Sequence, residues 1–408
     1  MELSPNPEAD SPPLPGLFVA SAYYYLTLLV VLAGVVFGAD FLHRQYHPNQ
    51  NQRGFINSLN NWDGFWYARI VDRGYSFDPD RQSSVAFYPA YPSVARGVKA
   101  ATGLSTEVSL LLTAHAALWG IFVTIGAYDR GRVGVRGSVD PHALMLTFGL
   151  WPMTLFFRMA YTESLFVLLE MVVLIGIHRR WRLPLIAVIA GAATAVRPVG
   201  VALLLPLLWD WNRRSTSWWG LFARMSVYGV VSCWGLLAYM GWLQVTFGDG
   251  LAFMQTQRHW ATRLELAWPE RAWSLLIFEP LWSVYLPSSS AYWANQEPVD
   301  NPLFSLQFWN PLLFLVSVVL VAWGAFKRWL TTPELLLACG LLAIPYVTHS
   351  YRALCLAQGR YAASVFPMYI VMARIATTLP ANVRHSILPV RRRLGIGSAL
   401  FAAWYRII

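Results

Sequence analysis

The chain alternates between long apolar runs and short polar segments rich in arginine. A membrane-spanning helix needs about 20 apolar residues, and Leu17–Ala39 meets that requirement. Apolar runs of comparable character follow at Glu107–Tyr128, Pro141–Phe157, Tyr161–Ile177, Leu221–Phe247, Leu306–Phe326, Pro333–Thr348 and Tyr361–Thr378. With the ambiguous runs counted, the pattern predicts an all-α polytopic membrane protein of about 9–11 transmembrane helices. The last run, Leu394–Ile408, is short for a full crossing.

The run Leu183–Trp209 has two interpretations: one long helix, or two short helices broken at Arg197-Pro198. Proline removes one backbone donor and disfavours helix at the residue before it. The break also returns Arg213 and Arg214 to the side that carries the other short basic loops. The broken interpretation is therefore favoured, with Arg197 at the outer end.

Short basic loops set the predicted orientation, because Lys and Arg gather on the cytoplasmic side. Residues 130–136, 178–182, 327–328 and 391–393 form such loops. The long loops 40–106 and 248–305 are then extracytoplasmic and carry short interfacial helices, one of them over Ala272–Leu286. The first long loop is itself rich in Arg, which opposes this orientation, but the rule weakens for loops beyond about 60 residues.

The predicted domain organisation has three parts. Residues 1–16, acidic and proline-rich, are predicted to be a disordered cytoplasmic tail. Residues 17–380 form the transmembrane domain, and residues 381–408 form a basic segment with a short C-terminal hydrophobic helix.

Composition supports a membrane protein, since only 13% of the residues are charged against about 25% in soluble domains. The net charge is +10, but the basic residues fall in short loops between apolar runs, so nucleic-acid binding is not predicted. The three cysteines, Cys233, Cys339 and Cys355, are widely spaced, which disfavours a disulfide framework or a metal cluster.

The most conspicuous polar stretch is Asn61–Arg69, where Asp63 lies among three aromatic rings, a glycine and an arginine. A carboxylate that accepts a proton beside rings that face a sugar suits glycosyl transfer at a lipid–water boundary. The alternative is an aromatic belt at the membrane surface with a solvated Asp.

Charged or titratable residues inside spans are costly and tend to be functional. The predicted topology collects several on the outer side: Asp63, Arg158, Glu163, Arg197, Arg258, His259, His349, Arg352 and Arg360. Each alone is also explained as a helix-end anchor or a neutral partner in the core, and Glu163 as a first-turn acid favoured by the helix dipole and by capping through Thr162. Together they suit a phosphate-bearing lipid donor and a hydroxyl acceptor.

No nucleotide-binding fingerprint is present: the sequence has no GxGxxG opening a helix after a strand, no Walker A motif, no HExxH and no CxxC. An activated sugar would therefore arrive on a lipid, and a cofactor or metal is not predicted.

Several motifs in order resemble the second GPI mannosyltransferase family (PIG-V type). They are Trp62-Asp63-Gly64-x-Trp66-Tyr67, Gly74-Tyr75, Phe87-Tyr88-Pro89-x-Tyr91-Pro92, Tyr161-Thr162-Glu163-Ser164-Leu165-Phe166, the Arg197 segment, Phe247-Gly248-Asp249 with Gln257-x-x-Trp260, and Arg360-Tyr361. They run from about Leu17 to Arg374, nearly the whole chain. The resemblance implies the C-type glycosyltransferase fold, a polyprenyl- or dolichyl-phosphate mannose donor, an active site on the non-cytosolic face, and inversion with Asp63 as the base.

The chain departs from the family at Gly250, where eukaryotic members often have Pro, and at Arg197-Pro198, where they tend to have Arg-Ser-Asn. These departures and the arginine-rich composition suggest a prokaryotic relative and leave the acceptor open. The expected location is the plasma membrane of a prokaryote, or the endoplasmic reticulum if the chain is eukaryotic.

The site hypothesis assigns each residue a role. Asp63 is the catalytic base. The donor phosphate and sugar are bound by Arg197, Arg360, Tyr361, Trp62, Trp66 and Tyr67. The acceptor site is shaped by Tyr88, Tyr91, Arg158, Tyr161, Glu163, Gln257, His259, Trp260 and His349.

The predicted function is transfer of mannose from a polyprenyl-phosphate donor to a glycolipid or glycan hydroxyl. The predicted partners are this donor, the acceptor and the membrane lipids around the protein. The alternative from another class is a transporter or flippase of an anionic lipid, which predicts inverted symmetry and broken helices in matching positions. Only one break, at Arg197-Pro198, is predicted, and two long outer loops are unmatched. An inactive scaffold in a larger synthase is a third possibility.

Overall fold

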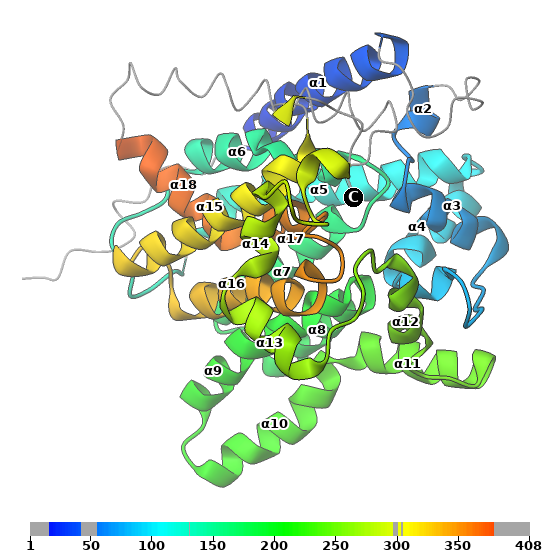
Figure 1. Ribbon diagram of the computed structural model, residues 1–408. Helices are drawn as coiled ribbons and strands as arrows, with labels where there is room; N and C mark the ends of the chain where they lie inside the picture. Colours follow the sequence, from blue (N-terminus) through cyan, green and yellow to red (C-terminus); the bar gives the residue numbers. More distant parts are fainter. Residues whose placement is uncertain (1–15, 42–54, 130, 297–300, 303–304, 379–408) are drawn as a thin grey trace, which may run out of the picture.

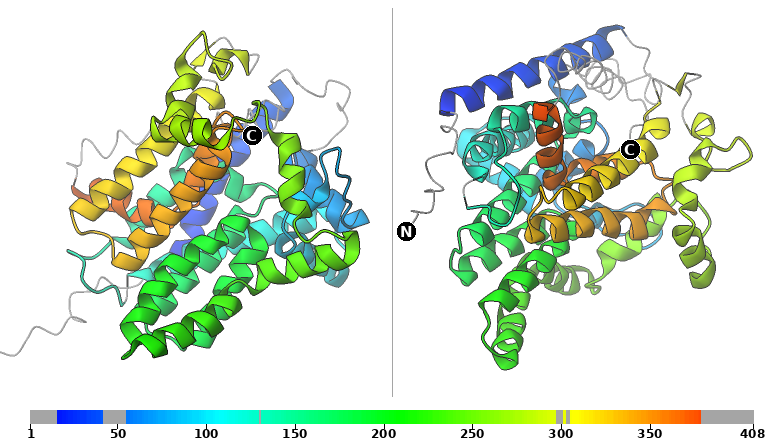
Figure 2. Two further views of the ribbon diagram at one scale, coloured as in Figure 1. Left: turned by 60° about the horizontal axis from the view of Figure 1, so that its bottom comes forward. Right: turned by 90° about the vertical axis from the view of Figure 1, so that its left-hand side faces the viewer.

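The computed structural model describes the chain except for residues 1–15, 42–54, 130, 297–300, 303–304 and 379–408. Throughout the described residues the regular elements are helices, without strands, which confirms the predicted all-α class. The predicted N-terminal tail and the run Leu394–Ile408 lie outside the described residues. In Figure 1, α1 (Leu17–Phe41) lies at the top of the molecule and α10 (Trp218–Ser232) at the bottom, and the right-hand view of Figure 2 keeps them at opposite ends.

Three described helices are long and apolar enough to cross a membrane. They are α1, whose apolar part is Leu17–Phe37, α5 (Thr106–Tyr128) and α15 (Leu306–Phe326). The number rises to five if each of two bent helix pairs counts as one span. The chain is thus an integral membrane protein, and the larger number of 9–11 spans stays a prediction.

The predicted helix Pro141–Phe157 is wrong in its second half. Helix α6 (Pro141–Leu150) ends before Pro152, and a 3₁₀ segment, Pro152–Arg158, follows it. The proline ring pushes Trp151 into an extended conformation, with φ −61° and ψ 133°, which ends the helix. The 3₁₀ segment then meets α7 (Glu163–His178) at 100°. This sharp turn leaves Glu163 at the very start of α7.

The break predicted at Arg197-Pro198 is confirmed. Helix α8 (Leu183–Val196) stops at Arg197, which is extended with φ −149° and ψ 144°. The chain continues through a 3₁₀ segment, Pro198–Leu203, into α9 (Leu204–Arg214).

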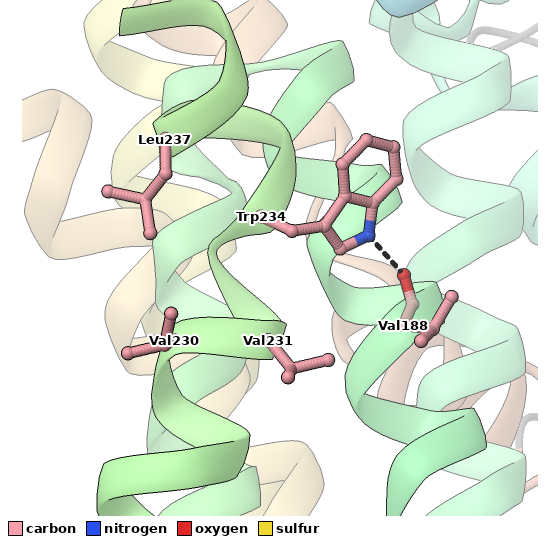
Figure 3. A pocket seen from close by; sticks show the side chains of 5 residues that line it. All are labelled: Val188, Val230, Val231, Trp234 and Leu237. Carbon is pink, nitrogen blue, oxygen red and sulfur yellow. Dashed lines mark hydrogen bonds between the residues drawn. The ribbon is translucent and has the colours of Figure 1, made fainter. Parts of the chain in front are cut away.

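A second break, which the sequence analysis did not predict, divides Leu221–Phe247 into α10 and α11 (Trp234–Phe247), bent by 58°. The N–H of Leu236 donates to the Thr194 hydroxyl at 3.1 Å, so a side chain of α8 takes a donor that a continuous helix would use. Beside the bend, Val188, Val230, Val231, Trp234 and Leu237 line an open apolar cavity of about 490 Å³ (Figure 3).

The predicted span Pro333–Thr348 is helical throughout: α16 (Thr332–Pro345) continues without a gap into a π-helical turn, Tyr346–Ser350. The next predicted span is interrupted. Tyr361–Thr378 becomes a short α17 (Gln358–Ala363) and α18 (Phe366–Thr378). The expectation of a single broken helix is therefore wrong, because three further helical runs are interrupted: Pro141–Phe157, Leu221–Phe247 and Tyr361–Thr378. None of these breaks is visible from apolar periodicity, which a short interruption leaves intact.

The described parts of the two long loops contain several short helices and contact each other. The first holds α2 (Phe55–Ser58), α3 (Asp63–Arg73) and α4 (Ala90–Thr102), and the second holds α12 (Ala252–Gln255), α13 (Trp268–Leu276) and α14 (Glu279–Trp282). The N–H of Ser83 donates to the Thr256 hydroxyl at 3.1 Å, and Arg258 donates to the carbonyl of Pro79 at 2.6 Å. Figure 1 shows α12 below α3 and α4 on the right of the molecule.

Candidate functional site

Four charged side chains from distant parts of the sequence meet at one point. Asp63 opens α3, Glu163 opens α7, Arg197 follows α8, and Arg360 lies in α17. We refer to these four residues as the Asp63 cluster. Three of the four were predicted to meet, with Asp63 as a base and the arginines at a phosphate.

Arg360 lies between the two carboxylates. Its Nη1 atom donates to Asp63 Oδ2 at 2.7 Å, and its Nε atom donates to Glu163 Oε1 at 2.5 Å. Arg197 Nη1 lies 3.0 Å from the same Oε1 atom. One oxygen of Glu163 therefore binds both guanidinium groups, and the two positive and two negative formal charges cancel.

The chain around Asp63 is fixed by a close approach to residues 160 and 161. A Cβ atom on Gly64 would lie 3.3 Å from Ala160 Cβ, so the small residue lets α3 begin here. The backbone N–H of Asp63 donates to the Tyr161 hydroxyl, which donates in turn to the carbonyl of Asn61, both at 3.3 Å. Trp62, just before, has a left-handed φ of 57°. These contacts direct the Asp63 carboxylate toward Arg360.

Arg360 is held from both sides. Its guanidinium lies 4.5 Å from the ring centroid of Tyr161 and 5.3 Å from that of Phe156. The N–H of the preceding Gly359 donates to Asn310 Oδ1 at 3.1 Å, and a Cβ on that glycine would lie 2.8 Å from the same oxygen. Glycine therefore allows α17 to approach α15 closely enough to place Arg360.

Arg197 is presented by the helix break. Because the backbone is extended there, the side chain reaches Glu163 and also Ser364, whose hydroxyl it contacts at 3.3 Å. Its guanidinium lies 5.5 Å from the Tyr361 centroid and 5.9 Å from that of Phe166. Aromatic faces favour a cation at these distances.

Exposure separates the members of the cluster. The side chain of Glu163 is fully buried, and those of Arg360 and Arg197 expose only 6% and 8% of their surface. Asp63 exposes 21%. Among the described contacts, Oδ1 of Asp63 has no hydrogen bond, and neither does the buried Oε2 of Glu163. The cluster thus presents one carboxylate oxygen outward, next to two guanidinium groups.

Predicted aromatic residues line part of this region. Trp66 stacks on Phe87 at 5.6 Å and meets Trp260 at 5.9 Å, which joins the two long loops beside Asp63. Tyr361 lies under Arg197, and the ring of His349 lies 5.6 Å from that of Tyr361.

Other predicted site residues are engaged elsewhere. Arg158 is buried and donates to the Thr27 hydroxyl on α1 at 2.6 Å. Tyr88 packs with Tyr239 and Phe253 in a separate apolar cluster. Two more lie in the core or at the loop contact: the Tyr91 hydroxyl donates to the carbonyl of Leu110, and His259 contacts the carbonyl of Pro79. Tyr67 is different: one turn after Asp63 in α3, it packs against Phe87 and Tyr91 and lies close enough to interact electrostatically with all four members of the Asp63 cluster. Gln257 is half-buried in the segment Thr256–Trp260.

The sequence analysis missed the residues that support the arginines. Asn310 also donates to the carbonyl of Leu356, so it fixes both ends of the turn before α17. An asparagine before Pro311 inside an apolar span was a usable signal, since polar groups there need partners. Nothing in the sequence marks Ser364 or Phe156 as neighbours of the cluster, whereas Phe166 belongs to the motif that contains Glu163.

Within the ranges that the structure describes, no three or more His, Cys, Asp or Glu side chains gather closely enough to hold a metal ion. That the reaction needs no metal or cofactor stays a prediction.

Comparison with known proteins gives one partial sequence match. The chain is 30% identical over 118 residues to GPI mannosyltransferase 2 of Drosophila melanogaster, which is 27% of this chain and 25% of that protein. The match agrees with the resemblance that the motifs predict, and it spans a quarter of the relative. No family model matches the chain.

Among solved structures, the chain is similar to the archaeal oligosaccharyltransferase AglB from Archaeoglobus fulgidus, in complex with an inhibitory peptide and a dolichol-phosphate. The TM-score is 0.44 and the identity 12%, over 93% of this chain and 55% of that one. At this TM-score the likeness does not by itself establish a common fold.

Proposed function

We propose that the chain is a membrane mannosyltransferase that uses a polyprenyl-phosphate-linked sugar and modifies a hydroxyl of a glycolipid or glycan on the extracytoplasmic face. The observation that carries the proposal is the Asp63 cluster: a partly exposed carboxylate 2.7 Å from one buried arginine, with a second arginine on the same shared glutamate. The partial match to GPI mannosyltransferase 2 supports the same class.

The cluster supports a single displacement. The acceptor hydroxyl gives its proton to the open Oδ1 of Asp63, and its oxygen forms the new bond to the anomeric carbon of the donor sugar. The bond from that carbon to the phosphate oxygen breaks, and its electron pair leaves with the phosphate. One attack from the face opposite the phosphate inverts the anomeric centre, and one base is enough for it.

The arginines act on the leaving group. Guanidinium groups bind phosphate through paired, charge-assisted hydrogen bonds, which are stronger than neutral ones. In this proposal Arg197 and Arg360 hold the donor phosphate and stabilise the charge that it gains as the sugar departs. Tyr361, Trp62 and Trp66 border the sugar, and the joined long loops bring Trp260 to the acceptor side.

Glu163 acts in this proposal as a positioning residue. Glu163 is buried, and one of its two carboxylate oxygens, Oε1, contacts both guanidinium groups and so fixes the distance between them. Without its charge, two arginines that lie side by side would repel each other, so the phosphate site would open before a donor arrives.

The proposal is tested by transfer from synthetic polyprenyl-phosphate mannose to a panel of glycolipid and glycan acceptors, using the purified full chain in detergent. We expect mannosyl transfer with this donor and none with a nucleotide-linked mannose. Polyprenyl-phosphate glucose as the preferred donor would contradict the choice of mannose. Transport of the lipid across proteoliposome membranes without any product would favour the transporter hypothesis instead.

A further inference from the structure

The second long loop contains an arm, residues 262–286, whose helix α13 turns its apolar side chains outward. Trp268, Trp273 and Leu276 expose 71%, 65% and 71% of their surface, whereas Ser274 is buried on the opposite face. Phe278 and Trp282 continue the exposed apolar surface past the end of α13. In Figure 1 this arm lies at the front of the molecule, over α16.

Lipid is the partner that fits this surface. Leaving a large apolar side chain in water costs about 1.5–3 kcal/mol relative to burying it, and contiguous exposed aromatics of this kind mark an interaction surface. Trp gathers at the level of the lipid head groups. The arm also packs against a membrane span: α14 lies beside α15, the Tyr285 hydroxyl donates to the carbonyl of Phe308 at 2.8 Å, and Val319 of α15 is exposed.

The inward face of the arm is polar and binds one segment of the chain, residues 346–357. Arg271 donates to the carbonyls of Val347 and Thr348 at 2.8 and 3.3 Å. The segment returns two bonds to the arm: the Tyr346 hydroxyl donates to the carbonyl of Leu275, and Cys355 Sγ donates to the carbonyl of Pro280. Arg352 is held twice, because its carbonyl accepts from the Thr262 N–H and its guanidinium pairs with the Glu265 carboxylate.

The arm is itself braced. Arg263 binds Glu279 through two hydrogen bonds, at 2.9 and 2.7 Å, and its guanidinium lies 4.5 Å from the ring of Tyr351. These contacts fix the arm and residues 346–357 as one unit.

The bound segment has an unusual backbone. It begins with the π-helical turn Tyr346–Ser350 and includes Leu354 and Cys355 in left-handed conformations, with φ of 52° and 59°. Such residues persist only where the surroundings hold them. The segment leads directly into α17, which carries Arg360.

We infer that the arm is a membrane-docked clamp. Its outward face inserts into the lipid head-group layer, and its inward face holds residues 346–357 in the backbone that presents Arg360 and Tyr361. Only the consequence for donor binding rests on the proposed function; docking and clamping stand without it.

Docking is tested with the full chain in phosphatidylcholine vesicles, carrying one nitroxide label at Trp273→Cys. Cys233 and Cys339 are replaced by Ala, and the buried Cys355 is retained. Labels at Val319→Cys on α15 and at the exposed Asp80→Cys on the first loop are the lipid and water references. We expect the ratio of oxygen to water-soluble nickel accessibility at Trp273 to exceed that at Asp80 several-fold and to lie below that at Val319, which is near the middle of the α15 span. A ratio equal to that at Asp80 overturns docking, and shielding from both reagents assigns the surface to a protein partner, which overturns the lipid assignment.

Clamping is tested by hydrogen exchange of residues 346–357 in Arg271→Met. Loss of the two bonds to Val347 and Thr348 should speed exchange there by about tenfold. Arg69→Met, an exposed arginine beside Trp66 on the first loop, is the matched control and should leave exchange unchanged. Unchanged exchange in Arg271→Met overturns the clamp. Neither measurement depends on transferase activity, so its failure and the failure of the proposed function are distinct results.

Discussion

The two ends of helix α7 each carry a buried carboxylate with arginines, and the two clusters differ in one respect. At the start of α7 lies the Asp63 cluster. Helix α7 has 16 residues and is therefore about 24 Å long. At its other end, His178 lies beside Glu334, which binds Arg132. We refer to Glu334, Arg132, Asp129, Tyr128 and His178 as the Glu334 cluster.

The Glu334 cluster is closed. Both oxygens of Glu334 accept from Arg132, and they also accept from the Tyr128 hydroxyl and the N–H of Thr331. The remaining Arg132 donors reach Asp129 and the carbonyl of Trp329. The side chains of Glu334 and Arg132 are almost fully buried. The network joins α5 to α16, and all four carboxylate oxygens of Glu334 and Asp129 accept hydrogen bonds, so no carboxylate oxygen is left for a ligand. The buried Nδ1 of His178 is the one polar side-chain atom of the cluster without a described partner.

The Asp63 cluster is open by the same measure. Asp63 Oδ1 and Glu163 Oε2 have no described hydrogen bond, and Asp63 reaches the surface. The two carboxylate–arginine networks are therefore told apart by whether their carboxylate oxygens are all engaged. Unused hydrogen-bonding capacity beside solvent indicates binding and chemistry, while complete satisfaction indicates a structural role.

The largest expected effect separates the two clusters by activity. Asp63→Asn removes the proposed base while preserving size, so turnover should fall by about a thousandfold, as expected for loss of a general base. The variant weakens a charge-assisted hydrogen bond to the buried Arg360, which Glu163 still neutralises, so the free energy of unfolding should fall by about 1.5–3 kcal/mol. A mannosyl-transfer assay measures the turnover, and thermal unfolding measures the stability. Turnover near that of the wild type would remove Asp63 from the mechanism, and Asp129→Asn in the other cluster is the control.

The converse variant, Glu334→Gln, should act on stability. It leaves Arg132 buried without its main counter-charge, which costs about 3–5 kcal/mol. Thermal unfolding in detergent should show the loss, while turnover per folded molecule stays close to that of the wild type. A specific loss of turnover at unchanged stability would show that the closed cluster takes part in function.

A smaller effect is expected at Arg197. Lysine keeps the charge but loses the paired donors, so Arg197→Lys should weaken inhibition by free polyprenyl phosphate about thirtyfold, or about 2 kcal/mol. Arg213→Lys is the matched control, because Arg213 stacks on Trp209 of α9, away from the cluster. Equal inhibition constants for both variants would exclude Arg197 from the phosphate site.

The smallest effect concerns a third acid–arginine pair, Glu279 with Arg263, in the second long loop. Burial alone would raise the pKa of Glu279, but hydrogen bonds and charge from Arg263 outweigh it and leave the pKa below its ordinary value of 4.5. The pair's contribution is therefore present above about pH 4.5 and is lost as the pH falls through the lower pKa of the folded state.

This contribution should amount to about 1 kcal/mol. Unfolding of the wild type and of Glu279→Gln, compared between pH 6 and pH 3.5, should show a steeper acid loss in the wild type. Parallel pH curves would show that this closed pair adds no measurable stability.

Part of the candidate site was predictable from single residues. A proline that follows an arginine at the end of an apolar run indicates a break, and Arg197 lies at one. An acid in an aromatic turn after the first span drew attention to Asp63. The bridging position of Glu163 was not predictable, because a first-turn acid is equally explained by helix capping.

The Glu334 cluster was missed although a signal existed. Thr331 and Glu334 have the spacing of a capping box, and the structure confirms that box at the start of α16. The contact with Arg132, 202 residues away, has no local signature. Arg158 shows the opposite failure: it resembled a site residue in the sequence, but it is directed toward Thr27 of α1.

The sequence by itself determined what short-range physics controls. Apolar length set the long spans α1, α5 and α15, proline set the break after α8, and the low charge content set the membrane class. Only the tertiary structure decided which charges meet, which of them remain open, and where helices bend between packed neighbours. The reason is that a buried charge is stabilised by whichever partner the fold brings within hydrogen-bond distance, and that partner lies 297 residues from Asp63 along the chain.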